Sequence, residues 1–202
     1  MQVESETLAD INLEAIEIIV NHVLYLRGIY PAQIFKKRRM YNTPVFVSIF
    51  PLLNSYIAGI LKSARELLLK DVLQCFEIIV YRNEENIETI VESYKIDIRQ
   101  GSLDKTKDPH LMEYEQQLRA ALYKMAERLK PLPKLDKTCQ FKIQLHTTQS
   151  SFVQLSHVAQ YQEFPWIQTQ NSVGRSDVKY SLLPLANVDQ PVGFKMQAYI
   201  YR

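Results

Sequence analysis

The N-terminal stretch from Thr7 to Arg27 is apolar around most of a helical circumference, and this feature limits the fold more than any other. A helix on the surface of a protein shows one apolar stripe, so a helix that is apolar nearly all round must be buried on several sides. Thr7 is expected to cap this helix, and Gly28 and Pro31 are expected to end it. We therefore expect a central helix that other elements cover. Its apolar residues are Ile11, Ala15, Ile16, Ile18, Ile19, Val20, Val23, Leu24 and Leu26.

Two further helices are predicted from apolar residues at helical spacing. Proline is favoured at the first helical position, so Pro51 is expected to open one helix, which continues to about Leu68. The other helix is expected to begin at Asp108-Pro109 and to end before Pro131. The basic run Lys36-Lys37-Arg38-Arg39 lies between the first two helices and is expected to form a connecting loop.

Alternation of apolar and polar residues predicts four strands, at about residues 74–82, 87–98, 138–147 and 194–201. The short polar joint at residues 83–86 makes the first two an antiparallel hairpin. Helices that alternate irregularly with antiparallel strands are typical of the α+β class. A chain of 202 residues fits a single domain, which we expect to span the whole sequence.

The segment from Gln149 to Gly193 joins the last two predicted strands and carries no sustained helical or strand period. Connections longer than ~12–15 residues are usually functional or disordered in a compact domain. This one contains two apolar groups, Phe164-Pro165-Trp166-Ile167 and Leu182-Leu183-Pro184-Leu185, which need a surface to dock on. We therefore predict a belt or lid that docks at two points and returns to the sheet.

The composition argues against several classes of function. A net charge of +2 gives no bulk attraction to nucleic acid. The two cysteines, Cys75 and Cys139, cannot form a disulfide scaffold, and neither they nor the four histidines show the spacing of metal ligands. No nucleotide-binding loop and no hydrolase motif occurs in the sequence. We therefore expect a protein without catalytic activity, metal or cofactor.

Two other functions stay open from the residues alone. The basic run 36–39 could be a nuclear localisation signal or could bind phosphate, including that of DNA, although a solvated surface run explains it as well. An enzyme with a site on the long segment would use His146 or His157, but no third group presents itself to hold either base. A histidine such as His22, on the central helix, is better explained as a hydrogen-bonded core or interface residue.

A series of short stretches, in order along nearly the whole chain, resembles the HORMA domain family. Each piece alone is weak evidence, whereas the ordered series is specific. Within the family, the series is similar to the branch that supplies the accessory (Rev-seven type) subunit of DNA polymerase zeta, and less so to the spindle-checkpoint members. The stretches include Leu24-Tyr25-Leu26-Arg27, Ile34-Phe35-Lys36-Lys37-Arg38, Tyr41-Asn42-Thr43-Pro44-Val45, Leu53-Asn54-Ser55-Tyr56-Ile57, Phe164-Pro165-Trp166-Ile167 and Leu182-Leu183-Pro184-Leu185.

The resemblance implies a three-helix layer on an antiparallel sheet, with a core at about residues 1–148 and a safety belt with its closing strand at about 149–202. It implies a non-catalytic adaptor for translesion synthesis and DNA repair, located in the nucleus and secondarily in the cytoplasm. The implied partners are the catalytic subunit of DNA polymerase zeta, a Rev-one type translesion polymerase, an AAA+ remodeller, and a second HORMA chain in a homodimer or heterodimer. The alternative within the family is a spindle-checkpoint or meiotic-axis adaptor.

The resemblance also assigns roles to particular side chains, in three groups. Two positions depart from the family pattern. Gln168 replaces a leucine two residues after the tryptophan, which makes the grip on a peptide less apolar, and Lys130 stands where a small residue is typical of the self-association face. The peptide channel is matched by Tyr56, Phe141 and Trp166, the second-partner surface by Leu182, Gln197 and Tyr199, and the self-association face by Lys37, Arg119 and Lys124.

Overall fold

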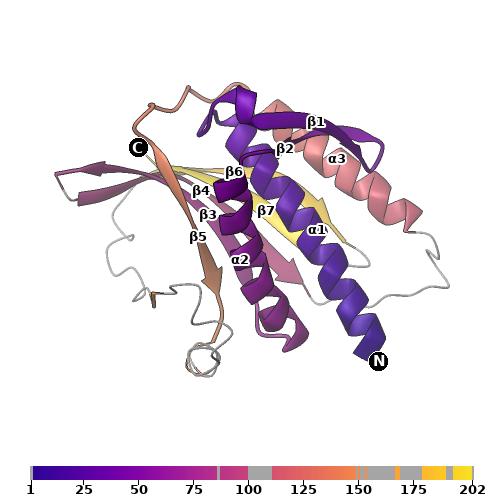
Figure 1. The fold of residues 1–202 in the computed structure, drawn as a ribbon. Coiled ribbons are helices and arrows are strands. Elements are labelled where there is room, and N and C mark those ends of the chain that lie inside the picture. The colour runs from indigo at the N-terminus through magenta and orange to yellow at the C-terminus, as the bar shows by residue number, and fades with distance from the viewer. Residues whose placement is uncertain are drawn as a thin grey trace.

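A computed structural model describes residues 2–85, 87–99, 111–148, 150, 153, 167–168, 179–189 and 193–201. Three helices, α1 (Gln2–Leu26), α2 (Pro51–Leu69) and α3 (Met112–Leu129), form a layer on one face of an antiparallel sheet (Figure 1). The expected α+β class is therefore confirmed. None of the described helices is both long and apolar enough to cross a membrane.

The main sheet has five strands in the order β5-β3-β4-β7-β6, and every neighbouring pair is antiparallel. Of the two strands that follow the long connection, β6 therefore forms the edge opposite β5, and β7 lies between β6 and β4 (Figure 1). The strands are β3 (Cys75–Glu84), β4 (Ile87–Arg99), β5 (Gln140–His146), β6 (Tyr180–Val188) and β7 (Gly193–Tyr201).

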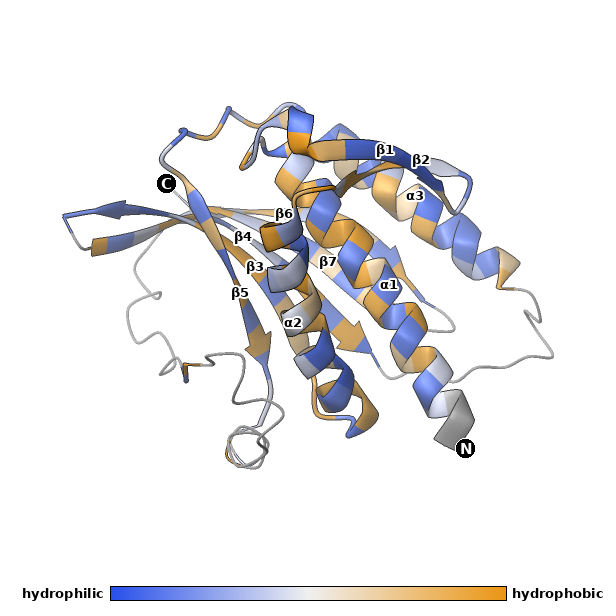
Figure 2. Ribbon diagram, viewed as in Figure 1, coloured by the Kyte–Doolittle hydropathy of each residue, from blue (hydrophilic) through white to orange (hydrophobic). Residues whose placement is uncertain are grey.

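The core lies between the helix layer and the sheet, and α1 is its central helix, as expected. This helix contacts both of the other helices, and hydrophobic residues recur along the part of it that is coloured in Figure 2. Alternate residues of β3 point into the same core, because successive side chains of a strand face opposite sides of the sheet. The fully buried members of this core include Ile16, Ile19, Leu24, Ile60, Leu67, Phe76, Ile78, Tyr94, Ile96 and Phe194.

The expectation that the basic run forms a loop is wrong. The run is part of a hairpin formed by β1 (Phe35–Met40) and β2 (Thr43–Ser48). Two buried residues, Phe35 and Val45, pack the hairpin into the core. Tyr41 and Asn42 both have positive φ, as a two-residue hairpin turn requires. Four consecutive charges remove the apolar–polar alternation that would have predicted this strand, and lysine and arginine are common on exposed edge strands.

Three element boundaries also differ from the sequence-based expectation. The first helix begins at Gln2, so Thr7 lies inside it and is not its cap. Part of the predicted belt is a strand, β6, and Pro184 concealed it because proline is confined to edge strands and bulges. The third helix begins at Met112, and the predicted start at Asp108-Pro109 lies outside the described residues.

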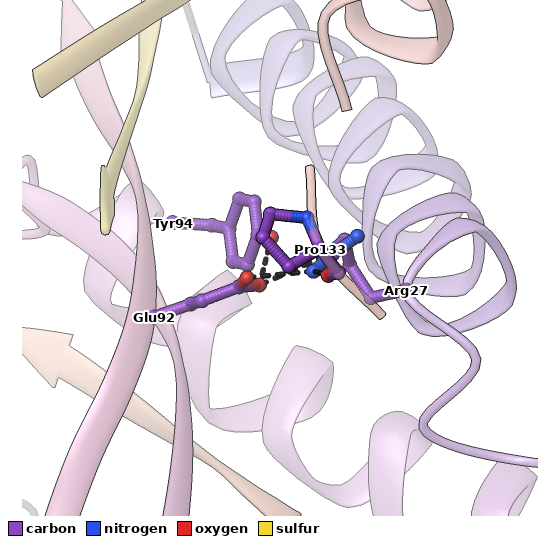
Figure 3. Close-up of polar contacts among 4 residues, drawn as sticks. All are labelled: Arg27, Glu92, Tyr94 and Pro133. Carbon is purple, nitrogen blue, oxygen red and sulfur yellow. Dashed lines mark hydrogen bonds and ion pairs between the residues drawn. The ribbon is translucent and has the colours of Figure 1, made fainter. Parts of the chain in front are cut away.

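A buried polar cluster joins the end of α1 to the sheet (Figure 3). The Arg27 guanidinium donates hydrogen bonds to both carboxylate oxygens of Glu92 on β4, at 2.9 and 2.7 Å. The same guanidinium donates to the carbonyl of Pro133, at 2.6 Å, in the connection from α3 to β5. The hydroxyl of Tyr94 donates to Glu92 as well. The cluster therefore fixes α1, β4 and the approach to β5 relative to one another.

His22 on α1 is buried, as expected, but the expected hydrogen bond is not found. Both ring nitrogens lack a partner among the described residues. Burial lowers the pKa of His22 to about 4. A histidine in the unfolded chain takes up a proton at about pH 6.5, so the unfolded state binds more protons below that pH and folding becomes weaker.

We therefore expect the free energy of unfolding to fall by about 2–3 kcal/mol from His22 alone between pH 7 and pH 4.5. The variant His22→Leu should lack this contribution, so its stability relative to the wild type should rise as the pH falls. Urea denaturation of both proteins at the two pH values measures the difference. If the difference in free energy of unfolding between the two proteins were the same at both pH values, His22 would not be held in its neutral form.

Candidate peptide-binding site

Within the part of the chain that the structure describes, no strand pairs with the outer edge of β5. β5 pairs with β3 along its whole length, from Gln140 opposite Tyr81 to His146 opposite Cys75, and with no other described strand. One row of its backbone N–H and C=O groups therefore faces away from the sheet. Such an edge is a template on which an extended peptide can add a strand through main-chain hydrogen bonds.

An aromatic cluster lies beside this edge, between β5 and the helices. The ring of Phe141 contacts that of Tyr56 on α2 edge-to-face, with centroids 5.7 Å apart. It also contacts Tyr30, which follows α1, with centroids 6.0 Å apart. Burial raises the pKa of Tyr56 above its ordinary value. Half-buried aromatic rings of this kind present rigid apolar area to a ligand at low entropic cost.

The structure thus brings together two of the three predicted peptide-binding residues, Tyr56 and Phe141. The third, Trp166, lies outside the described residues, as does His157. The sequence analysis did not assign Tyr30 to the peptide channel. The Tyr30-Pro31 pair directly after the central helix was the available signal.

The chain must cross from one edge of the sheet to the other between β5 and β6. β5 ends at His146 on one edge and β6 begins at Tyr180 on the opposite edge, and residues 147–179 join them. Ile167 and Gln168, which are described, are both exposed. The two ends of the predicted belt therefore lie at opposite edges of the sheet, which is the arrangement that a segment closing over the β5 edge requires. The closure itself stays a prediction.

The face of the sheet away from the helices carries a polar cluster next to the open edge. The buried carboxylate of Glu77 accepts a hydrogen bond from Ser93 Oγ at 2.5 Å, and its other oxygen lies 2.7 Å from His146 Nε2. A Ser–His nucleophile needs the histidine against the serine oxygen. Here the carboxylate lies between them, so the geometry holds His146 in place and does not activate Ser93.

The second-partner residues come together at the opposite edge of the sheet. Leu182 on β6 lies directly across from Tyr199 on β7, and Gln197 projects from the same face two residues earlier. Leu182 is 48% exposed. The Lys95 ammonium lies 5.0 Å from the centroid of the Tyr199 ring. Sequence reasoning missed Lys95 and the flanking ring of Tyr180, whose centroid is 5.4 Å from that of Tyr199.

The predicted self-association residues lie on two neighbouring elements. Lys37 is exposed on β1, Lys124 is exposed on α3, and Arg119 is half-buried on α3. The turn of the β1–β2 hairpin touches the first turn of α3 through the rings of Tyr41 and Tyr114, whose centroids are 6.3 Å apart. Lys130 is exposed at the end of α3. Self-association through this face stays a prediction.

Among the described residues, no group of three or more histidine, cysteine or acidic side chains could hold a metal ion. Cys75 and Cys139 are free and buried. Burial raises the pKa of the Cys75 thiol, which keeps it in its unreactive protonated form.

The sequence matches the HORMA domain family over residues 12–163. It is 51% identical to DNA polymerase zeta subunit 2 of Drosophila melanogaster, and the match covers 98% of each chain. It is 30% identical to the mitotic spindle assembly checkpoint protein MAD2B of Danio rerio, over 96% of this chain and 90% of the relative.

Two solved structures share the fold. One is the mitotic checkpoint complex, with a TM-score of 0.79 at 18% identity over 97% of this chain and 96% of the other. The second is HTP-2 of C. elegans bound to the HIM-3 closure motif, with a TM-score of 0.68 at 13% identity over 98% of this chain and 91% of the other. At these identities the likeness concerns the fold, and it extends over nearly the whole chain.

Proposed function

This chain belongs to the HORMA domain family, and we propose that it is the accessory subunit of a DNA polymerase zeta that clasps a peptide of the catalytic subunit. The family and the names of its relatives indicate a non-catalytic protein. The observation that carries the proposal is the open edge of β5 with Tyr30, Tyr56 and Phe141 beside it. The relative named as a polymerase zeta subunit supports this role over that of a checkpoint or meiotic-axis adaptor, because its identity to this chain is much higher.

In the proposed mechanism, an extended peptide pairs with β5 and places its prolines on the rings of Tyr56 and Phe141. Prolines restrict the free peptide, so less entropy is lost when it binds. The connection of residues 147–179, with Trp166, then closes over the peptide. The C. elegans structure contains a closure motif bound to a protein of the same fold, which supports this mode. Dissociation would require the connection to open, so release should be slow without an AAA+ remodeller.

We also propose that Leu182, Gln197 and Tyr199 receive a Rev-one type polymerase at the other edge of the sheet. These residues lie on β6 and β7, and β3 and β4 separate both strands from β5. Both partners could therefore be bound at once, and the chain would bridge them. For this role in DNA damage tolerance we propose that the protein is located in the nucleus and secondarily in the cytoplasm.

Purification of the tagged protein from its own cells, followed by mass spectrometry, tests the proposal. We expect the polymerase zeta catalytic subunit and a Rev-one type polymerase among the retained proteins. Recovery of kinetochore or chromosome-axis proteins in their place would support the alternative adaptor. The variant Leu182→Asp should lose the Rev-one type polymerase by about tenfold or more and retain the catalytic subunit, since it places a charge in an apolar contact. Loss of the catalytic subunit alone would reverse the assignment of the two surfaces.

A further inference from the structure

Three large apolar side chains lie exposed where β2 leads into α2. Leu52 is 73% exposed, Ile49 is 46% exposed and Phe50 is 38% exposed. Scattered exposed apolar residues are ordinary, but a contiguous group of this kind often marks an interaction site. We call these three residues the α2 start surface.

The α2 start surface is continuous with the aromatic cluster at the β5 edge. Leu52 precedes Tyr56 by four residues on α2, and residues at this spacing are neighbours on one face of a helix. At the N-terminal end of the α2 start surface, the backbone N–H of Ile49 donates a hydrogen bond to the carbonyl of Ile34 at 2.7 Å. That bond ties the surface to the short segment that begins at Tyr30, whose ring packs on Phe141.

The course of α2 shows which part of a bound peptide would meet this surface. Tyr56 touches Phe141 near the start of β5, whereas Thr147 Oγ1 donates to the carbonyl of Val72, past the end of α2, at 3.0 Å. α2 and β5 therefore run side by side in the same direction (Figure 1). The first turn of α2 precedes Tyr56, so a peptide strand that continues beyond Gln140 would arrive at Leu52.

We propose that the α2 start surface binds an apolar flank of the partner peptide that pairs with β5, and so selects among peptides. The inference rests on the proposed function of the β5 edge. The occupant is an extended peptide because the open edge next to the surface accepts a strand, and its flank is apolar because Ile49, Phe50 and Leu52 offer no charge or hydrogen-bonding group. Main-chain pairing would supply affinity, and this surface would supply specificity.

The test compares three synthetic peptides of the polymerase catalytic subunit by calorimetry: a proline-containing core, and the core extended by its natural sequence at either end. We expect one of the two extended peptides to bind the wild type about tenfold more tightly than the core peptide. Burial of a large apolar side chain contributes enough free energy for at least this gain in affinity. Only one extension should gain affinity, because only one end of the strand passes Gln140. The variant Leu52→Asp should abolish this gain and leave core binding unchanged.

The variant Ile87→Asp is the matched control, because Ile87 is 68% exposed in the β3–β4 hairpin and should not alter binding of any peptide. Equal affinity of all three peptides for the wild type would contradict the inference and leave the proposed function intact. Failure of every peptide to bind would contradict both. If Leu52→Asp instead converted a dimer to a monomer in sedimentation without changing peptide affinity, the surface would be a contact between copies of the chain.

Discussion

Replacing Glu92 by glutamine is expected to lower the free energy of unfolding by about 3–5 kcal/mol, the usual cost of removing one partner from a buried ion pair. The side chains of Arg27 and Glu92 are 4% and 3% exposed. Burial by itself lowers the pKa of Arg27, but its hydrogen bond with Glu92 and nearby negative charge reverse this and raise it. Glu92→Gln would leave a buried guanidinium without a counter-charge. Urea denaturation followed by circular dichroism measures the loss.

An exposed ion pair of the same chemistry provides the control. Arg65 donates to Asp10 at 2.8 Å, but both side chains are substantially exposed. Exposed pairs contribute little, because solvent screens them and both side chains lose freedom. Asp10→Asn should therefore leave the denaturation midpoint unchanged. Equal effects of the two variants would show that burial of Arg27 and Glu92 does not determine the strength of their interaction.

The second large effect is expected at Tyr56. Tyr56→Ala should weaken binding of the catalytic-subunit peptide by ~2 kcal/mol or more, or about 30-fold, the loss typical of an aromatic interface residue at the centre of a contact. Tyr56→Phe retains the ring and should retain most of the affinity, because stacking on proline needs the ring and not the hydroxyl. Calorimetry on the purified variants, after their folding has been checked, gives both values.

Tyr123→Ala is the control for this experiment, since Tyr123 is an exposed tyrosine on α3, away from β5. It should bind the peptide like the wild type. If Tyr56→Ala bound the peptide as tightly as Tyr123→Ala, the aromatic cluster would have no part in peptide binding.

Periodicity explains which elements were predictable. The three helices and four of the strands carry an apolar pattern of period 3.6 or 2, and that pattern depends only on which face is buried. The β1–β2 hairpin has no such pattern, because four charges follow Phe35, and Phe35 and Val45 are its two buried hydrophobic residues. In β6, Pro184 interrupts the strand beside a register shift, and most of the strand is on the surface.

The site was predictable only in part, for reasons of distance along the chain. Resemblance singled out Tyr56 and Phe141, but their contact depends on packing α2 against β5. Tyr30 joins the same cluster from the end of α1, and its contact with Phe141 depends on the packing of elements that are far apart in the sequence. Arg27 and Glu92 are separated by 65 positions, and charged residues are almost never fully buried unless they are paired. No local pattern could have identified them as partners.

Hydrogen–deuterium exchange of the protein with and without the catalytic-subunit peptide tests the central claim most directly. If the peptide adds a strand to the open edge, the outward-facing amides of β5, between Gln140 and His146, gain hydrogen-bond partners and should exchange more slowly. The amides of β6 should be unaffected. Slower exchange confined to β6 and β7, with β5 unchanged while the peptide is bound, would contradict the claim.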